Sequence, residues 1–477
     1  MTKKETSKKH GHKHSEVNEV VESITVDRRS RADRKADGKS MRLAVPLASH
    51  AHWHAPAHRR DPIDLLIESS IDRVPELLPI RYGRMLQSPF AFYRGAAAIM
   101  AADLAGLPVT GIRVQACGDC HLLNFGTFGT PERRLIFAIN DFDETLPAPW
   151  EWDIKRLAAS FVVAGRNNGF SAEEAREAAQ ASVRSYRERM REFAKMRGLD
   201  LWYHSIDAAE LVESVEDDVA RQRAKKRLAK ARDRDVLDED FPELVTFEDG
   251  AHRIRDNPPL IYHSQADDEA VVDARVKDGF ARYRANLPED RRLLLDRYEL
   301  KDVAMKVVGV GSVGTRCAIM LLMGGADDPL FLQIKQAQAS VLEPYAGKSI
   351  YPNHGQRVAM GQRLMQSATD IFLGWTETDL GNHFYVRQMR DMKVKPLVEL
   401  FGPGLMNQYA DACGWALARA HARSGDAAKI AGYLGKHEDF DMAVADFAEA
   451  YADQNELDHQ ALVKAVREGR LEAYIER

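Results

Sequence analysis

The sequence predicts an α+β protein in which long helical stretches surround a smaller β-rich segment. Residues 172–235, and the stretch from residue 403 onward, have the charged composition and apolar spacing of helices. Residues 302–308, 316–323 and 330–336 are short apolar runs separated by glycine-containing turns, the pattern of antiparallel strands. At 477 residues and 45% hydrophobic content, the chain can bury a large core, divided into about two to four domains or lobes.

The elements divide the chain into five expected segments. Residues 1–42 are rich in Lys, His, Ser and Asp and predict a disordered tail. Residues 43–170 carry the first polar motifs, and residues 171–300 form a helical insertion expected to shape a substrate region. Residues 301–400 form a β-rich lobe, and residues 401–477 complete the helical body.

Local patterns refine this division. Small and apolar residues at 90–104 predict one buried helix, and a further helix begins at Asp153, which serves as its N-cap. Further expected elements are short strands within 111–140, a helix near 270–286, a helix at 354–369, and strands near 372–376 and 382–389.

Composition excludes several classes of protein. The chain has 67 Lys and Arg against 72 Asp and Glu, so its net charge of −5 gives no general attraction to nucleic acids or anionic membranes. No apolar run reaches the roughly 18–20 residues of a membrane span. Four cysteines do not make a disulfide framework, and a reducing cytoplasm is expected.

Two local features have alternative interpretations. Cys117 and Cys120 form a Cys-x-x-Cys pair, but no second pair with similar spacing supports zinc or redox chemistry. The basic run at 221–234 is more typical of a solvated helix face than of a nucleic-acid contact.

Two polar motifs point to a reaction. Residues 118–126 read Gly-Asp-Cys-His-Leu-Leu-Asn-Phe-Gly, and residues 139–144 read Ile-Asn-Asp-Phe-Asp-Glu. An Asp followed five residues later by Asn, and then by an apolar strand ending in Asp-Phe, has the active-site spacing of kinase-like phosphotransferases. In that chemistry Asp119 accepts the proton of an attacking hydroxyl, while Asn124 and Asp141 hold the metal ions that bridge the ATP phosphates.

A glycine-rich turn, Gly309-Val-Gly311-Ser312-Val-Gly314, separates the first two strands of the β-rich lobe. It fits either a dinucleotide-binding fold or the phosphate-covering loop of a kinase. A dinucleotide-binding fold needs a helix directly after the glycines and an acid at the end of the next strand. Here a strand follows the turn, and the next strand ends in Lys335 and Gln. This order favours a kinase arrangement, in which Lys335 grips the α- and β-phosphates.

Five further side chains receive supporting roles. Glu343 is the nearest candidate for the carboxylate that fixes the strand lysine. Asp143 is a further candidate metal ligand. His121 is expected to pack beneath the catalytic loop and to bond a backbone group near the second motif. Asp153 is a structural helix start, and Arg94 is either the buried partner of an acid or an anion contact.

The motifs at 118–124 and 139–143 resemble the aminoglycoside phosphotransferase and choline kinase branch of the protein-kinase-like superfamily. Residues 152–157, Trp-Asp-Ile-Lys-Arg-Leu, resemble the structural Asp-Leu-x-Arg helix start of that branch. Residues 81–169 are similar to a bacterial family of uncharacterised proteins with the signatures Ser-Pro-Phe-x-Phe-x-Arg-Gly, Cys-Gly-Asp-x-His-x-x-Asn-Phe-Gly, Asn-Asp-Phe-Asp-Glu-Thr and Trp-Asp-x-Lys-Arg-Leu. The resemblance implies a bilobal protein-kinase-like fold that uses ATP and Mg²⁺.

The order of the motifs departs from that of ordinary kinases. There the glycine loop and lysine precede the catalytic loop, whereas here they follow it by about 190 residues. A circular permutation explains this order. It predicts that Lys335 lies within about 8 Å of Asp141, across a cleft capped by the glycine turn. It also predicts that residues 421–425 lie beside residues 114–117, because an unpermuted kinase would join those two points.

We therefore expect a cytoplasmic ATP- and Mg²⁺-dependent phosphotransferase acting on a hydroxyl or amine of an unknown small molecule or protein. The adenine would meet backbone groups just after the strand at 382–389. The alternatives are nucleotidyl transfer (AMPylation), a non-catalytic nucleotide-binding regulator, and a binuclear metallophosphatase. The metallophosphatase interpretation rests on Gly-Asp-x-His at 118–121, Gly-Asn-His at 381–383 and Gly-His-Lys-His at 11–14. These segments resemble the metal-binding motifs of such enzymes but occur in a different order along the chain.

Overall fold

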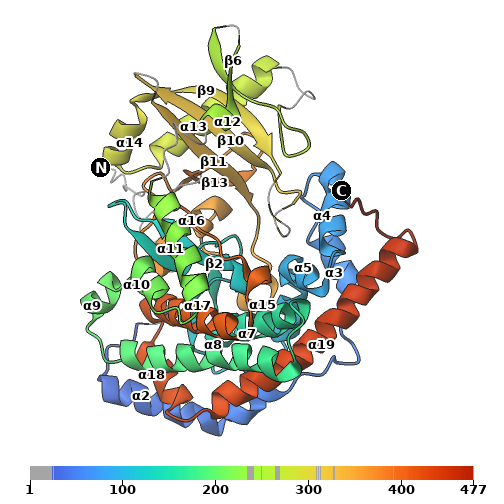
Figure 1. Ribbon diagram of the computed structural model, residues 1–477, viewed down its shortest axis with the longest axis vertical. Coiled ribbons are helices and arrows are strands. Elements are labelled where there is room, and N and C mark those ends of the chain that lie inside the picture. Colours follow the sequence, from blue (N-terminus) through green and yellow to red (C-terminus); the bar gives the residue numbers. More distant parts are fainter. Residues whose placement is uncertain are drawn as a thin grey trace, which may run out of the picture.

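The computed structural model describes residues 24–475, except 25, 234–240, 249, 264–268, 308, 310, 312, 326–327 and 390–391. The protein is a mixed α and β structure with several antiparallel sheets. Figure 1 shows the largest sheet at one end of the molecule and a body of long helices at the other. Among the described residues, no helix has the length and apolar character needed to cross a membrane.

The largest sheet has six strands in the order β12-β13-β11-β10-β9-β8, and every neighbouring pair is antiparallel. Its strands are β8 (Ile261–Tyr262), β9 (Tyr298–Lys306), β10 (Cys317–Gly324), β11 (Pro329–Ala337), β12 (Gly374–Glu377) and β13 (His383–Gln388). Both faces of β10 are apolar, so the sheet is covered on each side. Ile319 and Leu321 join one hydrophobic cluster, and Met320 and Leu322 join another.

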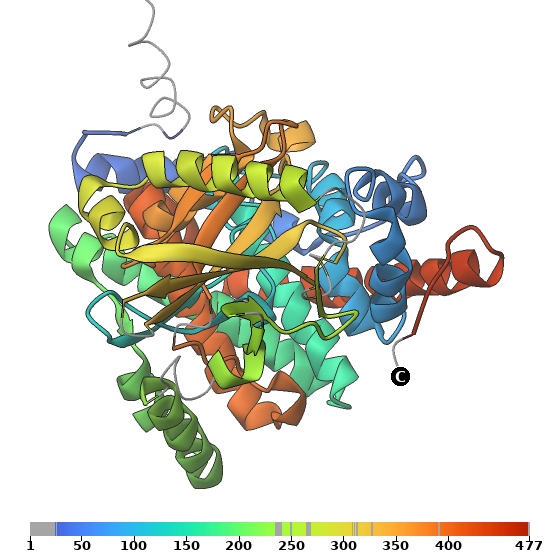
Figure 2. The same ribbon diagram turned by 90° about the horizontal axis from the view of Figure 1, so that it is seen from above.

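Different elements cover the two faces of this sheet. Tyr283 and Leu287, at and just beyond the end of α13 (Glu269–Ala285), pack with Leu322 and Leu332, and α14 (Glu289–Leu295) adds Leu295. Figure 2 shows α13 lying across the sheet. The other face packs against α12 (Phe241–Leu244) and the hairpin of β6 (Val245–Glu248) and β7 (Ala251–Ile254). Helix α16 (His354–Met365) contacts both the sheet and helix α17 of the helical body, and α15 (Glu343–Ala346) precedes it.

The helical body is built around a central layer that combines distant parts of the chain. Helices α8 and α17 pack against each other, and α7 and α19 pack on α8. The stacked rings of Trp150 and Tyr186, 5.7 Å between centroids, lie in its core. The helices are α2 (Arg31–Ser40), α3 (Pro62–Glu68), α4 (Leu78–Met85), α5 (Pro89–Gly95), α6 (Ala97–Leu104), α7 (Trp150–Asn167), α8 (Ala172–Phe193), α9 (Gly198–Tyr203), α10 (Ala208–Glu213), α11 (Asp218–Arg232), α17 (Pro403–Ser424), α18 (Ala427–Leu434) and α19 (Asp439–Arg467).

Short strands hold the two polar motifs between the sheet and the helices. Strand β1 (Arg113–Ala116) pairs with β4 (Leu146–Pro149), and β2 (Phe125–Gly129) pairs with β3 (Leu135–Ile139). A third strand, β5 (Ile206–Asp207), extends the second pair. The first motif therefore runs between β1 and β2, and the second runs between β3 and β4.

Several expected strands and helices match the structure to within a few residues, and others differ. Helix α2 forms inside the predicted tail, because it packs closely on α18. A Cβ at Gly38 would lie 1.9 Å from the Lys429 carbonyl oxygen. The helix expected over 90–104 is broken at Ala96, whose φ and ψ are −106° and 27°. Helix α7 begins at Trp150, so Asp153 lies inside its first turn and is not its N-cap.

The predicted insertion at 171–300 is divided between the two parts of the molecule. Helix α8 is buried in the helical body, whereas α13 and α14 cover the large sheet. The basic run lies mostly on α11, where Arg221 contacts Asp218 and Lys225 contacts Glu213 at 2.7 Å. Residue 234, at the end of that run, lies outside the described residues.

Candidate functional site

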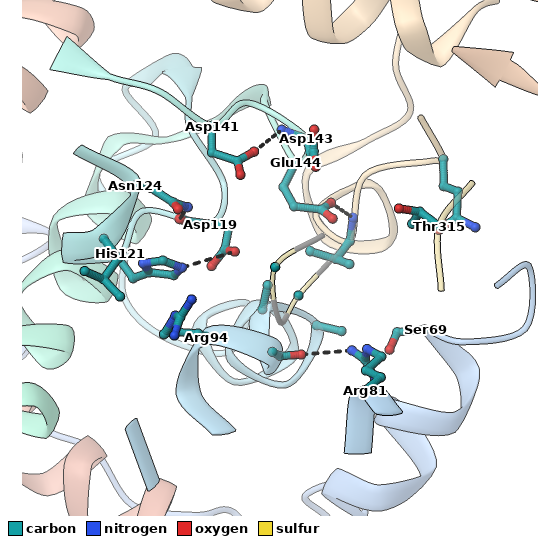
Figure 3. A pocket seen from close by; sticks show the side chains of 18 of the residues that line it. Ser69, Arg81, Arg94, Asp119, His121, Asn124, Asp141, Asp143, Glu144 and Thr315 are labelled. Carbon is teal, nitrogen blue, oxygen red and sulfur yellow. Dashed lines mark hydrogen bonds and ion pairs between the residues drawn. The ribbon is translucent and has the colours of Figure 1, made fainter. Parts of the chain in front are cut away.

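A cavity of about 480 Å³ opens between the large sheet and the helical body. A cavity of this volume is large enough for a small molecule. Residues from both polar motifs line it, together with residues 309, 311 and 315, residues 395–397 and 399, and helices α3 to α6. In Figure 3 the carboxylates of the two motifs lie on one side, and Arg94, Arg81 and Ser69 lie below them.

Asp119 projects into this cavity from the loop at 117–124, which we call the Asp119 loop. Arg156, from α7, donates to Asp119 Oδ1 through Nε at 2.8 Å and through Nη2. The second oxygen, Oδ2, lies 3.8 Å from His121 Nε2. Burial raises the pKa of Asp119, against the opposing effect of Arg156. One carboxylate oxygen is thus fixed by an arginine, and the other is left to face the cavity.

His121 is buried and faces Asp119, not the backbone of the second motif as expected. Burial lowers the pKa of His121 well below its ordinary value, and Arg156 and Arg94 act in the same direction. The imidazole is therefore neutral near pH 7 and adds no charge beside the Asp119 carboxylate.

The shape of the Asp119 loop is fixed by hydrogen bonds to its backbone. The Asn124 amide donates to the Asp119 carbonyl oxygen at 2.7 Å. Asp153 is 1% exposed and accepts from the backbone N–H of Cys117 at 2.6 Å and of Gly118 at 3.0 Å. His421 Nε2, near the end of α17, lies 3.0 Å from the same Asp153 carboxylate.

Gly118 also has a local reason to be glycine. Its φ is +84°, and a Cβ there would lie 2.4 Å from the carbonyl oxygen of Glu144. The close approach brings the Asp119 loop against the end of the second motif. The two motifs are therefore in direct contact.

The second motif meets the large sheet at Asp143. Lys335, from β11, donates to Asp143 Oδ2 at 2.8 Å, and the Tyr385 hydroxyl of β13 donates to Oδ1 at 2.5 Å. Burial acts to raise the pKa of Asp143, but Lys335 and Tyr385 outweigh it, so the pKa is lowered. Asp141 lies beside this pair, and the Asp143 N–H donates to Asp141 Oδ1 at 3.3 Å. Burial and the neighbouring Asp143 raise the pKa of Asp141.

The carboxylate partner of Lys335 is therefore Asp143 and not Glu343, the candidate taken from the sequence. Glu343 begins α15, and its Oε1 lies 3.9 Å from His354 Nδ1. Helix α16 contributes an arginine instead of an acid at this place. Arg357 donates to the carbonyl oxygens of Asp143 at 2.9 Å and Thr145 at 2.7 Å.

The glycine loop (residues 307–316) joins β9 to β10, and a strand follows it where a dinucleotide-binding fold would need a helix. Gly309 and Gly311 line the cavity. Arg84 donates to the Gly309 carbonyl at 2.5 Å, and Gly314 O accepts from the backbone of residue 74 at 2.7 Å. Ser312 lies outside the described residues.

Asn124 and Asp141 offer oxygen ligands to the same cavity. Because the Asn124 amide nitrogen is held by the Asp119 backbone, its oxygen is directed away from that bond. An amide oxygen and one carboxylate suit Mg²⁺, which usually completes its shell with water and substrate phosphates. In the described part of the chain, no three His, Cys, Asp or Glu side chains converge as a metal site. His383 instead accepts from the backbone of His354 at 3.2 Å, and residues 11–14 are not described.

Sequence reasoning missed three residues that hold the site together. Arg156 lay within a recognised motif, three residues after Asp153, but was assigned no role from the sequence. Tyr385 and Arg357 had no local signal, because their contacts with Asp143 depend on elements 242 and 214 residues away. Cys117 and Cys120 are both buried free thiols that flank Asp119.

The arrangement combines an antiparallel sheet with a lysine, a glycine loop, and two adjoining carboxylate motifs on a helical body. The chain belongs to the family described as uncharacterized protein conserved in bacteria (DUF2252), whose model matches residues 73–465. The matched region includes every cavity residue named above except Ser69. Neither the curated proteins nor the solved structures include a match to this chain.

Proposed function

We propose that this protein is an ATP- and Mg²⁺-dependent phosphotransferase with a circularly permuted, protein-kinase-like fold. The observation that carries the proposal is the 2.8 Å contact between Lys335 of the sheet and Asp143 of the second motif. A lysine on a strand and an Asp-containing motif must reach the same phosphates in a kinase. Asp143 lines the cavity, and Lys335 contacts it from a strand 192 residues away in the sequence, as that chemistry requires.

The order of the large sheet supports the proposal. The glycine loop joins β9 to β10, and Lys335 lies on β11, which is the third strand when β9 is counted as the first. Protein kinases likewise carry a glycine-rich loop over the phosphates and a lysine on the third strand. Lys335 pairs in register with Cys317 of β10 and with Tyr385 of β13, so the lysine occupies an interior strand.

The end of α17 supports the permutation. Ser424 Oγ accepts from the backbone N–H of Gln115 at 3.1 Å, and a Cβ at Gly425 would lie 2.6 Å from Val114 Cγ1. These are the two points that an unpermuted kinase would join directly. A short connection between them would give the usual order, with the glycine loop first and the catalytic loop after it.

In the proposed reaction, Asp119 accepts the proton of the acceptor group. Arg156 holds Asp119 Oδ1, which leaves Oδ2 to receive that proton. The raised pKa of Asp119 makes it a stronger base than an exposed aspartate, although proton transfer in kinases contributes only part of the rate. Asn124 and Asp141 would hold Mg²⁺, which supplies positive charge to the transferred phosphoryl group.

Lys335 and the glycine loop would bind the phosphates of ATP. The carbonyls of Gly309, Val313 and Gly314 face residues 73–84, where Arg73 donates to the Val313 carbonyl at 2.6 Å. Backbone N–H groups of such a loop are the usual phosphate ligands. Residues 390–391, where the adenine contact was expected to begin, lie outside the described residues.

The test is label transfer from ATP to components of a bacterial extract, with γ-labelled and α-labelled ATP in parallel reactions. Transfer of the γ label, lost in Asp119→Asn and kept in Asp290→Asn, would support the phosphotransferase. Asp290 is an exposed aspartate of α14 and provides a matched control. Transfer of only the α label would favour nucleotidyl transfer. ATP binding without transfer of either label would favour a regulator, and neither binding nor transfer would contradict the proposal.

A further inference from the structure

Arg94 is a partly buried cation without a hydrogen-bond or ion-pair partner among the described residues. It lies at the end of α5, and in Figure 3 its side chain points toward Asp119 and His121. Within the described residues no hydrogen bond or ion pair holds the guanidinium, and Nε is fully buried without an acceptor. The carboxylates that its charge reaches are those of Asp119 and Glu399.

Three neighbouring buried cations have defined partners. Arg156 is held by Asp119, and Lys335 is held by Asp143. Arg81 donates to the Gly95 carbonyl at 3.0 Å. A buried guanidinium that lacks such acceptors costs free energy, because it has lost water without gaining another partner. Arg94 lines the cavity, and its Nε has no acceptor, so the guanidinium has donors available to a ligand there.

Lys395 brings a second cation to the same cavity. Its backbone oxygen accepts from Arg227 at 2.7 Å, which fixes the segment, while no hydrogen bond or ion pair holds its ammonium in the part of the chain that is described. The cavity also contains acids, but Glu68 pairs with Arg60, and Glu144 accepts from the Val341 N–H at 2.7 Å. Apart from the motif aspartates Asp119, Asp141 and Asp143, the remaining acids are residues 72 and 399, which are exposed.

We propose that Arg94 and Lys395 form an anion-binding subsite for the acceptor, so that the acceptor is a small molecule bearing a phosphate group. Two cations match the charge of about −2 on a phosphate, and arginine presents donors that fit its oxygens. The subsite deepens the proposed phosphotransferase function and rests on it for the role of the ligand as acceptor. The anion would lie beside Asp119, so a neighbouring hydroxyl or amine of the same molecule would face the base.

The phosphates of ATP have different partners in this scheme. Lys335 contacts the second motif at Asp143, and Asn124 and Asp141 would hold the metal, whereas Arg94 comes from α5 beneath Asp119. ATP and the phosphate of the acceptor should therefore bind together. This separation distinguishes an acceptor subsite from a contact to the γ-phosphoryl group.

The experiment is isothermal titration of inorganic phosphate into the full-length protein, first alone and then saturated with Mg²⁺ and a non-hydrolysable ATP analogue. Phosphate should bind in both states. Arg94→Met should weaken phosphate binding at least about tenfold, as expected for a lost charge-assisted contact, and Arg94→Lys should restore part of it. Lys335→Met should weaken the analogue and leave phosphate affinity unchanged. Circular dichroism melting checks that each variant is folded.

Three results would overturn the proposal. Unchanged phosphate affinity in Arg94→Met would remove Arg94 from the subsite, and displacement of phosphate by the analogue would assign the contact to the γ-phosphoryl position. Binding of acetate without binding of phosphate would show a carboxylate site instead. Because phosphate is first titrated without nucleotide, a failure of the analogue to bind would contradict the proposed function while leaving the anion subsite tested separately.

Discussion

Replacing Asp153 with Asn should destabilise the protein and loosen the Asp119 loop. The Asp153 carboxylate is buried and contacts three groups, the backbone N–H of Cys117 and Gly118 and the ring of His421. Asparagine has only one oxygen acceptor. Its NH₂ group would therefore face either a backbone N–H or the His421 ring. The chain would therefore lose at least one charge-assisted bond and leave one buried donor without an acceptor.

The expected loss is on the order of 3–5 kcal/mol. A hydrogen bond to a charged group contributes about 1.5–3 kcal/mol, and a buried unsatisfied group costs about 1–3 kcal/mol. This is a large part of the roughly 5–15 kcal/mol that stabilises an ordinary domain. The helix itself should survive, because Asp153 lies inside α7 and does not cap it.

Urea unfolding, followed by tryptophan fluorescence, measures the change in the free energy of unfolding. Amide hydrogen exchange at Cys117 and Gly118 shows whether the Asp119 loop is where protection is lost. Asp441→Asn is the matched control, because Asp441 is also fully buried and binds Arg187 Nη2 at 2.7 Å on a different helix. The control should lose stability but leave exchange at 117–118 unchanged. A loss below about 0.5 kcal/mol in Asp153→Asn, the range of ordinary surface substitutions, would refute the reasoning.

Three further predictions concern the site and the core. Asp119→Asn should lower turnover about 10²–10⁴-fold and leave ATP affinity nearly unchanged, as measured by steady-state kinetics and titration; full turnover would remove Asp119 as the base. Asp141→Ala should abolish Mg²⁺-dependent ATP binding in the same titration, and undiminished binding would move the metal elsewhere. Burial raises the pKa of Glu151 from 4.5 to about 7, so the folded state holds the proton more tightly. The free energy of unfolding should fall by on the order of 3 kcal/mol as pH rises through that window, and Glu151→Gln should flatten this decline; an identical pH profile would contradict it.

The strands of the large sheet could be predicted from the sequence because their signals are local. The runs expected at 316–323 and 330–336 are β10 (Cys317–Gly324) and β11 (Pro329–Ala337). β10 ends at Gly324 and β11 begins at Pro329, so the sequence itself marks the turn between them. The same reasoning placed the start of α16 correctly but made the helix four residues too long, because the chain turns extended at Gln366.

Other features depend on contacts between distant segments. Helix α2 has no buried apolar stripe, and its closest packing is a glycine against the backbone of α18. A charged decapeptide gives no sign of that contact, so the sequence predicted disorder there. Asp153 was expected to cap a helix because acids commonly do so, yet β4 delivers the chain directly into α7, and the carboxylate turns to the Asp119 loop instead.

The partner of Lys335 shows most clearly what local reasoning lacks. Glu343 was chosen because it is only eight residues away in the sequence, whereas the acid that contacts the lysine is 192 residues away. Kinases usually place that acid on a helix after the lysine strand, whereas α16 of this chain presents Arg357 to the backbone of the second motif. The carboxylate that contacts Lys335 lies in the second motif itself.

The pairing of Lys335 with Asp143 is compatible with the proposed reaction, because one ammonium group can bind both a carboxylate and the phosphates of ATP. A lysine has three N–H donors, and Asp143 occupies one of them. Two donors remain for the α- and β-phosphates of ATP, so the ion pair orients Lys335 without consuming it. Tyr385 holds the other oxygen of Asp143, which prevents the carboxylate from turning away. In the proposed reaction, Asp141 is then the acid of this motif that remains to bind the metal, while Asp143 orients Lys335.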